Sequence, residues 1–216
     1  MRQFQSDFLD FVVDHEILKF GEFTLKSNRV SPYFFNAGLF NTGEKIAFLA
    51  KSYADAIASS GLDFDVLFGP AYKGIPLATA TSMALATNQG INKPFCFNRK
   101  EAKDHGEGGT IVGAALTGKT LVIDDVITAG TAIREAAEIL ADNGAVLCGI
   151  AVAMDRQEKG TGAKSAIQEI EENYQVPVIS IINLENIIDY IAQASDPHFQ
   201  THIDAIKSYR SEYGVN

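Results

Sequence analysis

The sequence predicts an α/β fold: a doubly wound, mostly parallel sheet flanked by helices. Continuous apolar runs recur along the chain between helical segments, which is the pattern of parallel strands covered on both faces. The 216 residues are 46% hydrophobic and 21% charged, which is typical of a globular chain with a sizeable core. This length suits one core with a modest appendage better than two full domains.

The first 40 residues, together with two C-terminal helical segments, are the expected source of the appendage. Apolar residues at helical spacing predict an amphipathic helix over residues 4–18, and two short segments at 23–26 and 32–38 favour strand or loop. The core is then expected over residues 41–216. It opens with a helix that starts at Asn41, has Glu44 in capping-box position and continues for about four turns.

Strands and helices alternate through the rest of the predicted core. Strands are expected at 65–68, 95–97, 110–116, 120–123, 145–154 and 176–182. Helices are expected at 75–88, 132–142 and 163–173, and two C-terminal helices at 184–194 and 197–213. Residues 117–119, Thr-Gly-Lys, are expected to form the turn of a hairpin between the two neighbouring apolar runs.

Charge and composition narrow the classes of function. Eighteen Lys and Arg against 27 Asp and Glu give a net charge of −9, which argues against nucleic acid or an anionic membrane as a partner. The longest apolar or glycine stretch, residues 145–154, is about half the length that a bilayer crossing needs. Cys96 and Cys148 both lie in apolar runs and are expected to be free core residues. We therefore expect a soluble, cytoplasmic protein.

The most informative motif is LVIDDVITAGTA at residues 121–132. An apolar strand ends in Asp124 and Asp125, and a turn of small residues then opens an amphipathic helix. Ligands of open α/β sheets bind at the carboxyl ends of strands, and free amides at a helix N-terminus bind phosphate. Adjacent carboxylates would repel a phosphate but accept hydrogen bonds from a ribose diol or attract Mg²⁺. The motif therefore favours a phosphorylated sugar over a merely capped helix.

Two further segments carry cations where an anion could bind. Residues 69–74, GPAYKG, form a glycine-bounded turn with Lys73 at its tip, suited to pyrophosphate but also to an ordinary turn. Residues 98–109, NRKEAKDHGEGG, cannot anchor themselves in a core, which suits a mobile lid over charge or a solvated loop.

A competing motif lies at residues 113–120, GAALTGKT, which matches the phosphate-loop pattern of ATP-binding proteins. That motif needs a helix to begin at its Lys-Thr pair. Here Lys119 and Thr120 lead into the apolar run LVI, which is predicted to be a strand. The sequence therefore disfavours ATP binding at this position.

These motifs together resemble the type I phosphoribosyltransferases, and among them the orotate phosphoribosyltransferase family. The resemblance runs from the N-terminal helix to the tail. It rests on LKSNRVSPYFFNAG at 25–38, FGPAYKGIPLA at 68–78, FNRKEAKDHGEGG at 97–109 and LVIDDVITAGTA at 121–132. It implies Mg²⁺-dependent transfer of a phosphoribosyl group from phosphoribosyl pyrophosphate (PRPP) to orotate, which yields orotidine 5′-monophosphate and pyrophosphate in pyrimidine biosynthesis.

The resemblance also implies roles for individual residues. The ribose hydroxyls would be held by Asp124 and Asp125, and the 5′-phosphate by the turn at residues 128–131. Residues implied to bind PRPP are Lys26, Tyr72, Lys73, Arg99, Lys100, Lys103, His105, Asp124, Asp125, Val126, Ile127, Thr128, Ala129, Gly130, Thr131 and Ala132. Residues implied to bind orotate are Lys26, Phe34, Phe35, Thr128 and Arg156.

Catalysis would depend on Lys103, His105, Asp124 and Asp125. Breaking the bond to pyrophosphate develops positive charge on the ribose and negative charge on the leaving group, so electrostatic stabilisation by Mg²⁺ and cations is expected. Most of the Mg²⁺ ligands would come from PRPP and water, and no protein ligand is assigned. In the family the charged loop reaches a neighbouring subunit, which implies a homodimer with Lys100, Lys103 and His105 acting in trans. The resemblance also implies that residues 1–40 form a hood over the base.

Two alternatives remain open at this stage. A phosphoribosyltransferase that acts on a purine or another base would have no need of Arg156, because a bidentate cation suits the carboxylated pyrimidine. A PRPP-sensing regulator that binds nucleic acid would need a basic face, which a chain of net charge −9 does not offer.

Overall fold

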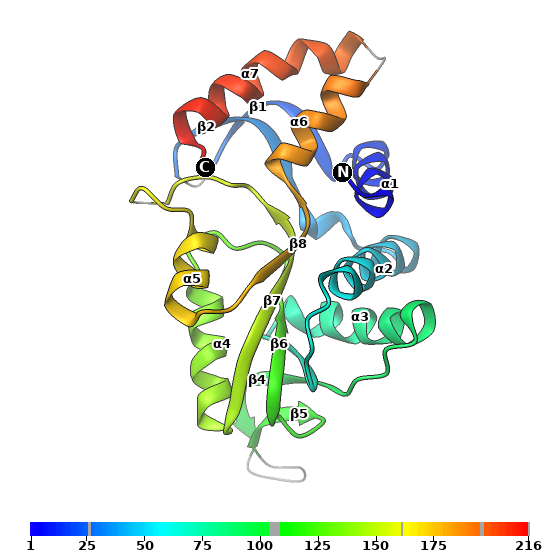
Figure 1. Ribbon diagram of the computed structural model, residues 1–216, viewed down its shortest axis with the longest axis vertical. Coiled ribbons are helices and arrows are strands. Elements are labelled where there is room, and N and C mark those ends of the chain that lie inside the picture. Colours follow the sequence, from blue (N-terminus) through cyan, green and yellow to red (C-terminus); the bar gives the residue numbers. More distant parts are fainter. Residues whose placement is uncertain (26, 104–108, 161, 195–196, 216) are drawn as a thin grey trace.

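A central six-stranded sheet in the order β5-β4-β3-β6-β7-β8 organises the computed structural model (Figure 1). The structure describes residues 1–25, 27–103, 109–160, 162–194 and 197–215. The strands are β3 (Val66–Gly69), β4 (Phe95–Lys103), β5 (Gly109–Gly113), β6 (Gly118–Ile123), β7 (Ala145–Asp155) and β8 (Val178–Asn183). Only the pair β4–β5 is antiparallel, at one edge of the sheet. The prediction of a mostly parallel sheet is confirmed.

Helices cover both faces of this sheet (Figure 1). On one face lie α2 (Gly43–Ser60) and α3 (Gly74–Gln89), and on the other α4 (Thr131–Asp142) and α5 (Ala166–Tyr174). Successive side chains along a strand point to opposite faces. Leu67 and Leu121 accordingly belong to one buried cluster, while Phe68 and Val122 belong to the other. Burial on both sides explains why the strands read as continuous apolar runs.

A smaller layer lies beyond the carboxyl end of the sheet. It contains an antiparallel two-stranded sheet of β1 (Leu18–Thr24) and β2 (Val30–Phe35), which packs against α7 (Pro197–Tyr213) from the other end of the chain. The helices α1 (Gln3–Asp14) and α6 (Leu184–Gln193) and the short 3₁₀ helix η1 (Ala37–Leu39) complete it. Phe8 and Tyr33 are fully buried in the same cluster as Leu67, so this layer shares the core of the sheet.

The predicted hairpin at residues 117–119 is wrong. Strand β6 begins at Gly118 and pairs with β3 and β7, whereas β5 pairs with β4. The backbone of Lys119 bonds instead to Asp65: the Lys119 amide donates to Oδ2 over 2.8 Å, and its carbonyl accepts from the Asp65 amide over 2.7 Å. Turn-forming residues between two apolar runs suggested a hairpin, but these contacts tie the start of β6 to the start of β3. Lys119 lies in a strand, as the argument against ATP binding requires.

Other element boundaries also differ from expectation. The first helix ends at Asp14, because residues 15–17 turn the chain into β1, where residue 18 pairs with Phe35. The charged segment predicted as a loop is partly strand, since β4 continues to Lys103, which pairs with Gly109. The cap of α2 is Thr42 rather than Asn41, and its side chain accepts from the Lys45 amide over 3.3 Å.

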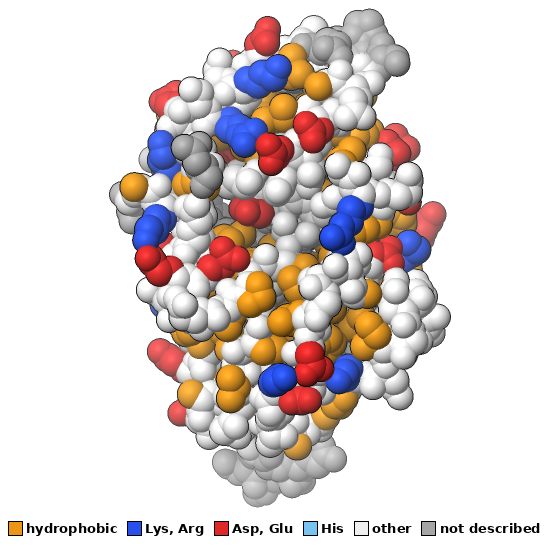
Figure 2. Space-filling model, in the orientation of Figure 1, with side chains coloured by type: hydrophobic (Ala, Val, Ile, Leu, Met, Phe, Trp, Pro, Cys, Tyr) orange, Lys and Arg blue, Asp and Glu red, His pale blue; other side chains and the backbone are white. Residues whose placement is uncertain are grey.

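The surface carries charges of both signs. On the face shown in Figure 2, lysine and arginine side chains lie interspersed with acidic ones and do not merge into one basic surface among the coloured residues. Within the described part of the chain, no helix is both long and apolar enough to cross a membrane. Cys96 is buried, as predicted, but Cys148 is only half-buried, and both thiols are free.

Candidate active site

A cavity of about 320 Å³ lies at the carboxyl ends of β3 and β6, the two central strands. From β3 the chain proceeds to β4 on one side, and from β6 it proceeds to β7 on the other. Such a reversal of strand order leaves a crevice in which open α/β sheets bind ligands. The cavity is lined by Pro70, Ala71, Tyr72, Lys73, Asp124, Asp125, Val126, Ile127, Thr128, Ala129, Gly130, Thr131, Ala132 and Ile133.

The two acids that follow β6 are buried and held by backbone contacts. Asp124 and Asp125 are 9% and 8% exposed. The buried Tyr53 hydroxyl donates to the Asp124 carbonyl over 2.7 Å, and the Asp125 carbonyl accepts from the Ala153 amide over 2.8 Å. Burial, with a smaller effect from the neighbouring Asp125 charge, raises the pKa of Asp124 to about 6. The Asp124 carboxylate is therefore not fully stabilised by water, and hydrogen bonds from a diol or contact with a cation would stabilise its charged form.

The turn at residues 128–131 leads directly into α4. Gly130 adopts a φ of +71° at the N-cap, a conformation that glycine reaches without strain. Arg134, one turn into the helix, donates from Nη2 to the Ala129 carbonyl over 2.7 Å and so braces the turn. The first amides of α4 have no partner within the helix and are suited to bind a phosphate at this end.

The opposite wall of the cavity is a tight turn after β3. A Cβ on Gly69 would lie 2.1 Å from the Gly74 carbonyl oxygen, so only glycine allows this close approach. The Asn98 side chain, from β4, fixes the turn by accepting from the Ala71 amide over 2.8 Å. The peptide bond between Ala71 and Tyr72 is cis. This arrangement leaves the Tyr72 side chain 71% exposed at the edge of the cavity.

An ion pair joins the two walls. The Lys73 Nζ lies 2.6 Å from Oδ2 of Asp125, and the lysine side chain is 69% exposed while that of Asp125 is 11% exposed. The hydrogen bond to Asp125 is the largest cause of a raised pKa at Lys73. Lys73 therefore brings a cation to the mouth of the cavity, where an anionic ligand could draw it away from the carboxylate.

The charged segment approaches this cavity through β4. Lys100 Nζ lies 6.0 Å from the centre of the Tyr72 ring of its own chain. Arg99 is half-buried in the same strand. The backbone of Lys103 ends the strand, whereas Lys26 and His105, both implied by the family resemblance, lie outside the described residues.

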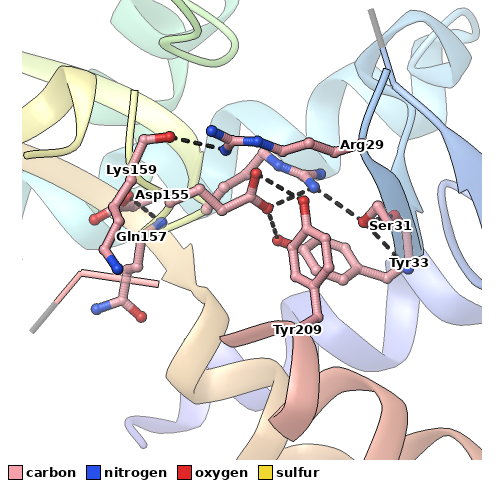
Figure 3. A network of polar contacts seen from close by, with 9 residues as sticks. Arg29, Ser31, Tyr33, Asp155, Gln157, Lys159 and Tyr209 are labelled. Atoms are coloured by element: carbon pink, nitrogen blue, oxygen red, sulfur yellow. Dashed lines mark hydrogen bonds and ion pairs between the residues drawn. The ribbon is translucent and has the colours of Figure 1, made fainter. Parts of the chain in front are cut away.

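Of the described residues expected at the base, Thr128 lines this cavity, whereas Phe34, Phe35 and Arg156 do not. Phe34 is 38% exposed and stacks on Phe23 at 5.6 Å, while Phe35 packs into the core against Phe8 and Phe40. Arg156 follows the end of β7, and its Nη2 donates to the hydroxyl of Ser31. Figure 3 shows the polar network around Ser31. Met154 pairs with Val126. Arg156 and Thr128 each lie two residues beyond that pair, so the two segments leave the sheet side by side.

Sequence reasoning missed several residues that shape this site. Tyr53 was interpreted only as part of an apolar helix face, and nothing in the sequence indicates that its hydroxyl reaches residue 124. Asn98 was interpreted as the start of a charged loop, although a polar residue directly after an apolar run is a signal that it ends a strand. For Arg134 the sequence signal is its place one turn into the helix that follows the predicted phosphate turn.

The chemistry of the donors fits a divalent cation only in part. Asp124 and Asp125 offer oxygen ligands of the kind that Mg²⁺ prefers. Among the described residues no group of three or more His, Cys, Asp or Glu side chains is placed to hold a metal ion. These two carboxylates alone would not fill the octahedral coordination that Mg²⁺ prefers.

Comparisons with known proteins agree with this geometry. The phosphoribosyl transferase domain family matches residues 39–179. Orotate phosphoribosyltransferases from Marinobacter nauticus and Escherichia coli O157:H7 are 60% and 57% identical to this chain over 215 residues. Each match covers 100% of this chain and 100% of the relative.

Solved structures show the same likeness. The crystal structure of orotate phosphoribosyltransferase from Francisella tularensis has a TM-score of 0.88 and 47% identity, and the match covers 96% of this chain and 99% of that one. An adenine phosphoribosyltransferase from Thermoanaerobacter pseudethanolicus, at 13% identity and a TM-score of 0.51, shares the fold alone. With its cavity between β3 and β6 and its full-length relatives, the chain belongs to the orotate phosphoribosyltransferase family.

Proposed function

We propose that this chain transfers the phosphoribosyl group of PRPP to orotate. A bond forms between a ring nitrogen of orotate and the anomeric carbon of the ribose, and that nitrogen loses its proton. The bond from the anomeric carbon to pyrophosphate breaks, and pyrophosphate leaves with the bonding electrons. One observation carries the phosphoribosyl part of the proposal: a single cavity joins the acids Asp124 and Asp125, the turn at residues 128–131 and the cation Lys73. The choice of orotate is supported by relatives of that name at 57–60% identity.

Each wall of the cavity suits one part of PRPP. Asp124 and Asp125 would accept hydrogen bonds from the ribose hydroxyls, and the amides at residues 128–131 would bind the 5′-phosphate. Tyr72 and Lys73 would face the pyrophosphate, together with Arg99 and the loop cations. A Mycobacterium tuberculosis relative of the same fold, at 21% identity, has been solved in complex with PRPP.

Catalysis in this proposal is mainly electrostatic. Mg²⁺, when bound, neutralises charge on pyrophosphate as it leaves. Lys73 can leave Asp125 for the pyrophosphate, and Lys100, Lys103 and His105 would close over it and exclude water. Of the two aromatic residues expected at the base, Phe34 has the exposed ring that can meet orotate, while Phe35 holds β2 in the core. The strands β1 and β2 would form the hood over the base.

The partner in this proposal is a second copy of the chain. Helix α3 begins shortly after the exposed Tyr72, and its surface carries Met83, which is 66% exposed. Pairing with a second copy would remove an exposed apolar surface of this helix from water. Pairing here would bring the charged loop of one subunit close to the other's cavity. We expect this dimer to act in the cytoplasm, a compartment compatible with the free thiols Cys96 and Cys148.

The proposal is tested by following the absorbance of orotate with purified protein, PRPP and Mg²⁺, with adenine, hypoxanthine and uracil in parallel reactions. We expect consumption of orotate alone, because Arg156 suits a carboxylated base. Consumption of a purine would point to a different base, and no reaction with any base despite PRPP binding would contradict the enzymatic assignment.

Replacement of Lys103 by alanine should lower kcat by about 10²- to 10³-fold, comparable to the loss of one preorganised donor in an oxyanion hole. The effect on orotate affinity should be smaller, because the lysine acts on the leaving group. Steady-state kinetics with both substrates measure this. Lys51→Ala, which removes an exposed lysine paired with Asp55 on α2, is the control and should change kcat by less than about twofold. Near-native turnover of Lys103→Ala would remove this lysine from the mechanism.

Asp124→Asn should stabilise the free protein while weakening PRPP binding. Because folding raises the pKa of Asp124 to about 6, the folded state binds its proton more tightly than the unfolded state. The contribution of this residue to stability therefore falls as pH rises from about 4 to 6. At pH 8 the variant should gain about 1–3 kcal/mol in free energy of unfolding, and about half as much at pH 5. Urea denaturation and PRPP titration measure both effects, and a variant less stable than the native chain at pH 8 would contradict the argument.

Met83→Glu should convert a dimer into a monomer with reduced turnover, because it places a charge in an apolar interface. Size-exclusion chromatography with light scattering should give twice the mass of one chain for the native protein and the mass of one chain for the variant. Val146→Glu is the matched control, since Val146 is 62% exposed at the start of β7, far along the sheet from the cavity. A native chain that is monomeric at micromolar concentration would refute the dimer.

A further inference from the structure

The carboxylate of Glu158 lies at the centre of a buried polar network beyond the end of β7. Its side chain is 11% exposed. Oε1 accepts from the Tyr33 hydroxyl over 2.9 Å and lies 2.6 Å from Nη2 of Arg156, and Oε2 accepts from the Tyr209 hydroxyl over 3.1 Å. Both carboxylate oxygens are therefore bound, and Glu158 has little freedom to move.

The network joins parts of the chain that are distant in sequence. Tyr33 comes from β2 and Tyr209 from α7, and their rings meet edge to face at 6.3 Å (Figure 3). They are 0% and 5% exposed. Burial is the largest cause that raises the pKa of both tyrosines, and the nearby Glu158 carboxylate raises it further, so both hydroxyls remain donors.

The backbone around Glu158 is fixed as well. The Gln157 amide donates to Oδ1 of Asp155 over 2.8 Å, and Arg29 donates from Nη1 to the Lys159 carbonyl over 2.8 Å. On the other side, the Lys159 amide donates to the carbonyl of Tyr213, at the end of α7, over 2.7 Å. The segment that carries Glu158 is thus held between the N-terminal strands and the C-terminal helix.

These contacts fix the orientation of Arg156. Its Nη2 donates to the Ser31 hydroxyl over 3.1 Å in addition to its ion pair with Glu158, so both hydrogens on that nitrogen are used. The guanidinium lies over the Tyr33 ring at 4.4 Å. A carboxylate that approaches Arg156 must therefore be met by its other N–H groups, which the network holds in one plane.

We propose that Glu158 is a positioning residue for orotate: clamped by Tyr33 and Tyr209, it orients Arg156 to receive the carboxylate of the base. This inference rests on the proposed function, in which Arg156 faces orotate. It makes α7 part of the base site, because Tyr209 supplies one of the two hydroxyls that hold Glu158. The Glu158 carboxylate also offsets the charge of the largely buried Arg156 in the absence of substrate.

The test compares KM for each substrate in Glu158→Ala, Glu158→Gln and Tyr209→Phe. Glu158→Ala should raise the KM for orotate about tenfold, the equivalent of one hydrogen bond to a charged group, with KM for PRPP and kcat changed by less than about threefold. Glu158→Gln should recover most of the loss, because its amide oxygen can still accept from Nη2. Tyr209→Phe should raise the orotate KM by about threefold. The control is Glu172→Ala on α5, which breaks an exposed ion pair between Glu172 and Lys164.

Two results would overturn the inference. One is an orotate KM in Glu158→Ala that stays within twofold of the native value. The other is an equal rise in KM for both substrates, in parallel with a lower melting temperature, which would indicate a structural role only. If Glu158→Ala does not fold, the same criteria apply to Tyr209→Phe, for which the expected rise in orotate KM is about threefold. If the native chain consumes no orotate at all, both the proposed function and this inference are refuted. If the native chain consumes orotate and the variants keep its KM for orotate, the inference alone is refuted.

Discussion

The pairing of β3 with β6 at the centre of the sheet is the constraint on which the site depends. Because the chain continues from these two strands in opposite directions, a crevice opens between their carboxyl ends. Each wall contributes what its own sequence can supply: a glycine turn with a lysine from β3, and two acids with a helix N-terminus from β6. The contact of Lys73 with Asp125 exists only because these strands are neighbours.

Burial of the Asp124 carboxylate is unfavourable for the stability of the free protein. Its backbone is anchored by Tyr53, and its side chain is buried beside a second acid, which raises its pKa to about 6. A free protein would be more stable without this charge. A ligand that offers a diol or a cation would give the Asp124 carboxylate the partners that it lost when it was removed from water. The ion pair between Lys73 and Asp125 provides partial compensation until that ligand arrives.

Local patterns in the sequence were sufficient to predict much of the fold and one half of the site. The strand, acids, turn and helix of residues 121–132 are contiguous, so their arrangement follows from the sequence alone. Strand order does not, and the false hairpin at residues 117–119 shows why: turn-forming residues indicate a change of direction but not which strand lies alongside. The partners of Glu158 were equally hidden, because Tyr33 and Tyr209 are 125 and 51 residues away in the chain and meet only in the folded layer.

The central claim is that the crevice between β3 and β6 binds PRPP as one unit, and a crystal structure with PRPP and Mg²⁺ tests it most directly. The account predicts the 5′-phosphate on the amides of residues 128–131, the ribose hydroxyls on Asp124 and Asp125, and Lys73 displaced from Asp125 toward the pyrophosphate. A structure in which PRPP lies elsewhere, or in which the phosphate avoids the turn while Lys73 stays on Asp125, would contradict it.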